Sequence, residues 1–118
     1  MSKITIVDLE VNYCVGVGDE ERAKPQRLLL TVDMAFDFSS AAVSDRIEKT
    51  IDYQVLTTDL LHYGEGRSWK LIERLAANLA EFILARYKPQ SVLVEVKKFV
   101  IPQARYVAVS LTRSRPQR

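Results

Sequence analysis

Residues 28–38 read Leu-Leu-Leu-Thr-Val-Asp-Met-Ala-Phe-Asp-Phe, and their alternation is the strongest indication of the fold. Apolar side chains occupy every even position, whereas Asp33 and Asp37 occupy odd ones. Successive side chains of a strand point to opposite faces, so this pattern predicts a long antiparallel strand with one buried face. The same period runs from Ile4 to Val17 and contains a register slip at Val7–Asp8, which predicts a second long strand. The polar, glycine-containing residues 16–26 between them predict a wide hairpin connection.

Two helices are predicted in the middle of the chain. Asp52 is a candidate N-cap for a first helix, which Gly64-Glu65-Gly66 ends. Ser68 is a candidate cap for a second helix, which ends near residues 87–89. Both helices carry apolar residues at helical spacing: Tyr53, Leu56, Leu60 and Tyr63 in the first, and Ile72, Leu75, Ala76, Leu79, Phe82 and Ile83 in the second.

Two further strands follow, at residues 92–97 and 106–112. The order strand-strand-helix-helix-strand-strand predicts one α+β domain over residues 1–118, an antiparallel four-stranded sheet with both helices on one face. Such a sheet has two long apolar edges that must be charged, covered or paired. Pairing between copies in a closed ring would satisfy both edges, so we expect a homo-oligomer.

Composition narrows the possible partners. The net charge is +2, and no basic groove with interleaved aromatic residues is visible, so we expect no nucleic-acid partner. No stretch has the length of a membrane span or the pattern of a signal peptide, so a cytoplasmic protein without a membrane partner is expected. Because Cys14 is the only cysteine, the chain cannot form an intrachain disulfide. We expect Cys14 to be a buried structural thiol.

Lys98 is the first candidate for chemistry. It continues the parity of Val94 and Val96, so it emerges at the end of an apolar strand face. Desolvation disfavours the ammonium form and would make Lys98 a candidate for proton transfer, although a lysine that reaches out to water has the same pattern. Lys97 points to the opposite face, beside Glu95, as a surface residue.

Three other residues could bind or react with a ligand. Glu73, in about the first turn of the second helix, could bind a planar pair of donors, or could simply be an acidic residue that the helix dipole favours there. Tyr53 could be a core residue, an aromatic lid or a phenolic proton relay. Glu21 lies in the hairpin loop, where carboxylates are usually solvated. His62 has no partner at metal-ligand spacing, and no zinc pattern, phosphate-binding glycine loop or nucleophile elbow is present, so no metal is expected.

Taken together, the motifs resemble the dihydroneopterin aldolase family. The similarity runs from about Ile4 to Thr112, almost the whole chain. The order and spacing of short motifs carry it: Val15-Gly16-Val17 before an acidic loop that ends at Glu21, Ile51-Asp52-Tyr53, Leu71-Ile72-Glu73-Arg74-Leu75-Ala76, and Val94-Glu95-Val96-Lys97-Lys98.

The resemblance implies the tunnelling fold, in which four subunits close their sheets into a barrel and two rings stack as an octamer. It also implies active sites between neighbouring chains, in a tetramer or octamer. The implied reaction cleaves 7,8-dihydroneopterin, a reduced pterin, to 6-hydroxymethyl-7,8-dihydropterin and glycolaldehyde in folate biosynthesis. Because the reduced ring can delocalise the carbanion, the implied chemistry requires no cofactor, metal or Schiff base.

The resemblance also implies residue roles. Glu73 would hold the 2-amino and ring N–H edge of the pterin, with hydrogen bonds from the backbone at Ile72. Tyr53 would close over the ring, Lys98 would be the general acid/base, and Glu21 would position or deprotonate the side-chain hydroxyl.

Some alternatives stay open. Phe99 follows Lys98 where many members have proline, so Lys97 remains a second candidate for the working lysine. Gly18 stands where many members have a larger residue, so a looser loop before Glu21 is expected. A dihydroneopterin triphosphate epimerase shares the scaffold, and Arg67, Arg74 and Arg105 are candidate contacts for a triphosphate. A non-catalytic pterin-binding ring is the third alternative.

Overall fold

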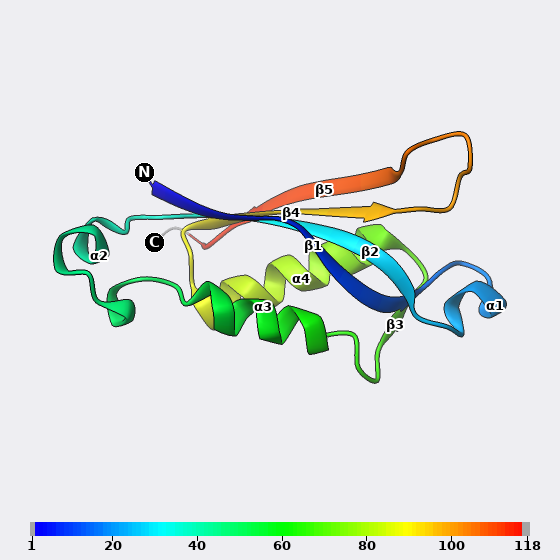
Figure 1. Cartoon of the computed structure of the whole chain (residues 1–118), viewed down its shortest axis with the longest axis horizontal. Helices are drawn as coiled ribbons and strands as arrows, with labels where there is room; N and C mark the ends of the chain where they lie inside the picture. Colours follow the sequence, from blue (N-terminus) through cyan, green and yellow to red (C-terminus); the bar gives the residue numbers. More distant parts are fainter. Residues whose placement is uncertain (1, 117–118) are drawn as a thin grey trace.

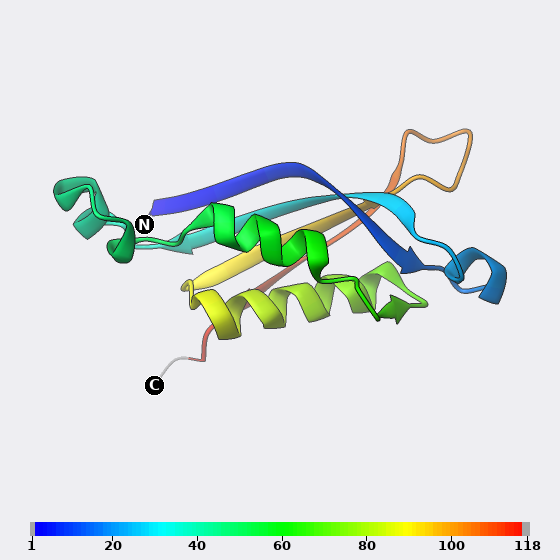
Figure 2. The ribbon, with the colours of Figure 1, turned by 60° about the horizontal axis from the view of Figure 1, so that its bottom comes forward.

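The computed structural model describes residues 2–116; Met1, Gln117 and Arg118 lie outside the described part. Five strands form one sheet in the order β3-β1-β2-β4-β5, and two long helices cover one face of it (Figures 1 and 2). The strands are β1 (Ser2–Val15), β2 (Gln26–Phe36), β3 (Ser68–Trp69), β4 (Ser91–Lys98) and β5 (Val107–Ser114). The helices are α1 (Asp19–Arg22), α2 (Ser39–Ser44), α3 (Tyr53–His62) and α4 (Ile72–Tyr87), with a 3-10 turn η1 (Ile47–Lys49).

The register slip predicted in the first strand is confirmed as a β-bulge. Ile6 pairs with Val32 and Leu9 with Leu30, so Val7 and Asp8 together stand opposite one residue of β2. Asp8 adopts a left-handed φ of 53°, and its backbone N–H donates to the Thr31 hydroxyl at 3.1 Å. The bulge exchanges the two faces of β1 and thereby brings Val11, Tyr13 and Val15 into the core.

The predicted first helix is confirmed together with its cap. A carboxylate oxygen of Asp52 accepts hydrogen bonds from the backbone N–H groups of Gln54 and Val55, at 3.0 and 3.3 Å. Leu56 and Leu60 are fully buried, and the Leu60 carbonyl accepts the hydroxyl hydrogen of Tyr13. The helix therefore packs on β1 through both apolar and polar contacts.

The second helix begins later than the sequence predicted, and Ser68 does not cap it. Residues 68–69 instead form β3, parallel to β1, with Cys14 paired to Ser68 and Val15 to Trp69. The indole ring of Trp69 is buried, stacks on Tyr63 and donates to the Asn78 side chain at 3.0 Å, which holds the segment extended. The sheet is therefore mixed and five-stranded, and the prediction of four antiparallel strands was wrong in this respect.

Two other details differ from the predictions. Residues 39–49, for which no element was predicted, contain the short and largely exposed α2 and η1. Cys14 is only partly buried. Within residues 2–116, no helix has the length and apolar character that crossing a membrane requires.

The face of the sheet opposite the long helices is polar. Cross-strand ion pairs join Lys3 to Asp33 and Glu10 to Arg27. Lys97 also lies on this face, with its amine 2.8 Å from Asp8 and its side chain only 15% exposed. It is thus more enclosed than a surface lysine. The pairing of sheet edges between copies stays a prediction.

Candidate functional site

Four segments far apart in the sequence meet at one end of the molecule. The N-terminal end of α4 and the C-terminal end of β4 lie there, together with α1 and β3 (Figures 1 and 2). This arrangement follows from the topology, because α4 runs back along the sheet before β4 returns. Glu21, Ile72, Glu73 and Lys98 belong to these segments, so one chain brings four of the five predicted residues to the same end.

Lys98 and Glu21 form an ion pair across this end. The Lys98 amine lies 2.9 Å from Glu21 Oε2, and the side chains are 12% and 38% exposed, respectively. Lys98 stands opposite Leu28 in the register and follows the buried residues Val94 and Val96 on the same face of β4. Strand parity therefore predicted the enclosure of Lys98 correctly, whereas its partner could not be read from the sequence.

The electrostatics favour an ionised Glu21. The hydrogen bond from Lys98 is the main cause that lowers the pKa of the Glu21 carboxyl, with smaller contributions from the Gln26 side chain and the Val17 backbone N–H. Gly16 lies directly against this carboxylate, since a Cβ atom there would meet Glu21 Oε1 at 2.5 Å. Glycine at position 16 thus leaves space for the pair.

Two further side chains, which no sequence motif indicated, hold the loop that carries Glu21. Arg22 Nη1 donates to the carbonyl oxygens of Gly16 and Val17, at 2.9 and 3.1 Å. Gln26 Nε2 donates to the Val15 carbonyl at 2.6 Å. The only sequence signal for these contacts is the polar character of residues 16–26, which any exposed loop shares.

Glu73 and Ile72 form the first turn of α4. Ile72 is buried, whereas Glu73 is exposed and makes no ion pair within residues 2–116. Leu71 precedes the helix in an extended conformation, and no described side chain caps the first turn. The first backbone N–H groups of a helix have no partner within it, so this turn can donate hydrogen bonds to a ligand beside the Glu73 carboxylate.

A single chain does not bring Tyr53 to this end. Tyr53 is the first residue of α3, which begins at the far end of the molecule and runs towards β3 (Figure 1). Its side chain is 56% exposed. A site that contains both Tyr53 and Lys98 therefore requires two copies of the chain.

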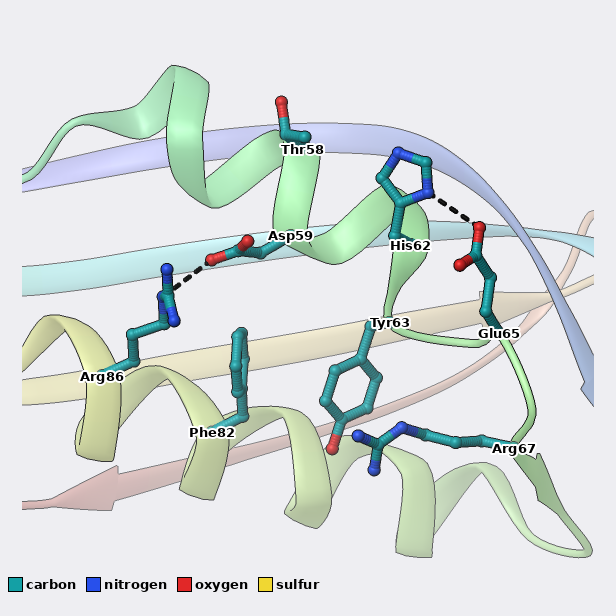
Figure 3. A pocket seen from close by; sticks show the side chains of 8 residues that line it. All are labelled: Thr58, Asp59, His62, Tyr63, Glu65, Arg67, Phe82 and Arg86. Atoms are coloured by element: carbon teal, nitrogen blue, oxygen red, sulfur yellow. Dashed lines mark hydrogen bonds and ion pairs between the residues drawn. The ribbon is translucent and has the colours of Figure 1, made fainter.

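A hollow of about 300 Å³ between α3 and α4 contains none of the five predicted residues (Figure 3). An ion pair between Arg86 and Asp59 at 2.9 Å and a hydrogen bond between His62 and Glu65 at 2.8 Å flank it, and the Arg67 guanidinium lies over the Tyr63 ring. Of these contacts, only the Arg86–Asp59 pair joins the two helices, because the other two lie between the end of α3 and the loop that follows it. Across residues 2–116, no group of three or more His, Cys, Asp or Glu side chains is placed to hold a metal ion.

Comparisons with known proteins agree on one family. The family model described as "FolB: Dihydroneopterin aldolase" matches residues 4–112. A dihydroneopterin aldolase of Haemophilus influenzae is 31% identical over 114 residues, which are 96% of this chain and 97% of that protein.

Solved structures show the same similarity in three dimensions. FolB from Vibrio cholerae O1 superimposes with a TM-score of 0.92 at 33% identity and covers 98% of both chains. Dihydroneopterin aldolase of Escherichia coli, solved in complex with neopterin, gives a TM-score of 0.90 at 30% identity, over 97% of this chain and 100% of that one.

Proposed function

Because the chain belongs to the dihydroneopterin aldolase (FolB) family, we propose that it is a carbon–carbon lyase that cleaves 7,8-dihydroneopterin. The products are 6-hydroxymethyl-7,8-dihydropterin and glycolaldehyde. The Lys98–Glu21 pair carries the proposal. An enclosed amine that lies 2.9 Å from an ionised carboxylate can transfer protons together with it, at the end of the molecule where α4 begins.

The proposed reaction is a retro-aldol cleavage. The ionised Glu21 accepts the proton of the hydroxyl group on the carbon that becomes the aldehyde. The bond between this carbon and the one attached to the ring breaks, and its electron pair passes into the ring system. The Lys98 ammonium group donates a proton to the ring-attached carbon, and Glu21 then passes its proton to the neutral Lys98 amine, which restores the ion pair. Positioned acid/base groups of this kind contribute about 10²–10⁴ in rate.

Glu73 is the proposed anchor for the pterin ring. Its two carboxylate oxygens can accept from the 2-amino group and the adjacent ring N–H as a bidentate pair. The open first turn of α4 adds the backbone N–H of Ile72 as a donor. The neopterin complex of the Escherichia coli relative supports a pterin as the ligand class.

Tyr53 is proposed to come from a neighbouring copy. Its place at the opposite end of the 50 Å molecule fits a ring in which each site joins two chains. The exposed edge strand β5 supports a ring for a second reason, because it can pair with another sheet.

The test is incubation of the purified protein with 7,8-dihydroneopterin while glycolaldehyde and hydroxymethyldihydropterin are followed. We expect both products to accumulate, also in the presence of a chelator. Epimerisation of the side chain without release of glycolaldehyde would instead identify an epimerase. Pterin binding without any turnover would identify a non-catalytic ring.

A further inference from the structure

We propose that Arg22 is a positioning residue: its guanidinium ties α1 to the end of β1 and thereby holds the Glu21 carboxylate against Lys98. The catalytic consequence of this inference rests on the proposed function. The geometric part does not, because it concerns only contacts within the chain.

The first step is the enclosure and bonding of the guanidinium. Nη1 donates to two successive carbonyl oxygens, those of Gly16 and Val17, at 2.9 and 3.1 Å. Only 19% of the Arg22 side chain is exposed. A planar guanidinium that bridges two carbonyls fixes their relative orientation, which a flexible single amine does less well. Arg22 is thus a clasp on the turn that leaves β1.

The second step is that this turn is anchored to the rest of the fold. The Gly16 N–H donates to the Trp69 carbonyl at 2.9 Å, so one of the two residues that Arg22 binds is tied to β3 directly after the β1–β3 ladder. Trp69 is itself buried against Tyr13 and Tyr63. The clasp therefore connects α1 to the rigid core.

The third step is that α1 depends on such outside contacts. It has four residues, buries none of them, and has no side-chain N-cap among the described residues. A helix of this length is not stable by itself, because its few hydrogen bonds do not offset the unfavourable free energy of nucleation. Without the clasp, the segment 19–22 keeps the contact of Glu21 with Lys98 but loses the side-chain contacts that tie it to the end of β1.

The fourth step links the clasp to Glu21. The two residues are adjacent, but their side chains bind different partners. The Arg22 guanidinium donates to the carbonyl groups of the turn, and the Glu21 carboxylate pairs with the Lys98 amine. Holding Arg22 therefore restricts the backbone from which the Glu21 carboxylate extends. The groups that face this carboxylate are the Lys98 amine, the Gln26 amide and the Val17 N–H, and the last of these lies within the clasped turn.

Asp19 provides a matched control. It also contacts the Arg22 guanidinium, but its side chain is 96% exposed, so the ion pair is screened by solvent and adds little. Asp19→Asn should leave the two carbonyl contacts, and hence Glu21, in place.

The experiment compares the parent chain with Arg22→Ala and Asp19→Asn. The first measurement is an NMR titration of the ¹³C-labelled Glu21 carboxyl without substrate. We expect the pKa of Glu21 to lie below its ordinary value in the parent and in Asp19→Asn, and to rise towards that value in Arg22→Ala. A general loss of stability would not move this pKa in the folded protein.

The second measurement is turnover of 7,8-dihydroneopterin. Small misplacements of reacting groups cost up to about 10²-fold in rate, so we expect Arg22→Ala to lower kcat by about ten- to a hundredfold, with a smaller change in KM. Arg22→Lys should recover only part of the loss. If Arg22→Ala does not fold, Arg22→Lys carries both measurements, with changes in the same direction.

The two proposals fail in distinguishable ways. A folded Arg22 variant whose Glu21 pKa equals that of the parent overturns the positioning role, whatever the activity. A parent chain that does not act on dihydroneopterin overturns the proposed function, while the titration still decides the role of Arg22.

Discussion

The Lys98 amine lies 2.9 Å from a carboxylate oxygen of Glu21, although the two residues belong to opposite halves of the chain. The end of a central strand supplies the amine, and a four-residue helix supplies the carboxylate. Both of these elements lie at the end of the molecule where α4 begins with its open first turn (Figure 1). The chemistry of this site thus depends on how firmly a short surface segment is held.

The pair makes stability depend on pH. The hydrogen bond from Lys98 lowers the folded pKa of Glu21 below 4.5, so its contribution is present above the unfolded pKa and is lost as pH falls through the folded pKa. We expect Glu21→Gln to be less stable than the parent near neutral pH, by less than about 1 kcal/mol because the carboxylate is partly exposed. Urea unfolding should show this difference shrinking towards acid pH; a difference that grows instead would contradict the assignment.

Removal of the Lys98 amine should separate catalysis from binding. For Lys98→Ala we expect turnover of dihydroneopterin to fall by about 10²–10⁴, since a proton-transfer group is lost. The dissociation constant for a pterin should change little, as measured by fluorescence titration. Lys97→Met is the companion variant, because Lys97 lies on the other face of β4 and pairs with Asp8. A larger loss of turnover in Lys97→Met than in Lys98→Ala would assign the proton transfer to Lys97 instead.

Glu73 is expected to act mainly in binding. Glu73→Gln keeps the shape of the side chain but removes the charge and one acceptor, so pterin affinity should fall by about 1.5–3 kcal/mol. Glu81→Gln, on an exposed position of the same helix, is the control and should bind like the parent. Isothermal titration of both variants checks this, and equal affinities would refute the anchor.

Subunit mixing tests whether Tyr53 and Lys98 of different copies share a site. Tyr53→Ala and Lys98→Ala should each be nearly inactive alone. After denaturation and joint refolding at equal amounts, random rings would contain intact sites at about a quarter of the interfaces. Recovery of roughly that fraction of parental activity is expected. Complete absence of recovery in mixed oligomers, verified by mass spectrometry, would place both residues' roles within one chain or remove Tyr53 from the site.

Much of the fold could be predicted because its strands and helices follow simple periods. The alternation in residues 28–38 and the capped stripe after Asp52 both correspond to the predicted elements. The error at Ser68 has a physical cause, since a serine before an apolar stripe is a good cap, whereas burial of the Trp69 ring draws the segment into the sheet. Tertiary packing of one large ring outweighs a local capping preference.

The candidate site was predictable in its helix and strand residues and less so in its loop. Parity indicated the enclosed face for Lys98, and the apolar stripe placed Glu73 on the second helix, although the start of that helix was predicted too early. The contacts of Arg22 and Gln26 depend on the path of an irregular turn, which no period encodes. Tyr53 could not be placed from one chain, because its suggested partners lie at the opposite end of the molecule.

The bulge at Val7 and Asp8 allows residues of both parities in β1 to share one buried face. Because these two residues stand opposite one residue of β2, removal of either would leave an unbroken ladder, in which Leu9 keeps its partner Leu30 and Tyr13 still faces the core. Insertion of one residue after Leu9 would instead turn Tyr13 towards water and Cys14 towards the core, and the Leu60 carbonyl would lose its hydroxyl partner. The first strand should therefore tolerate the loss of one codon at its bulge but not the gain of one codon beyond it.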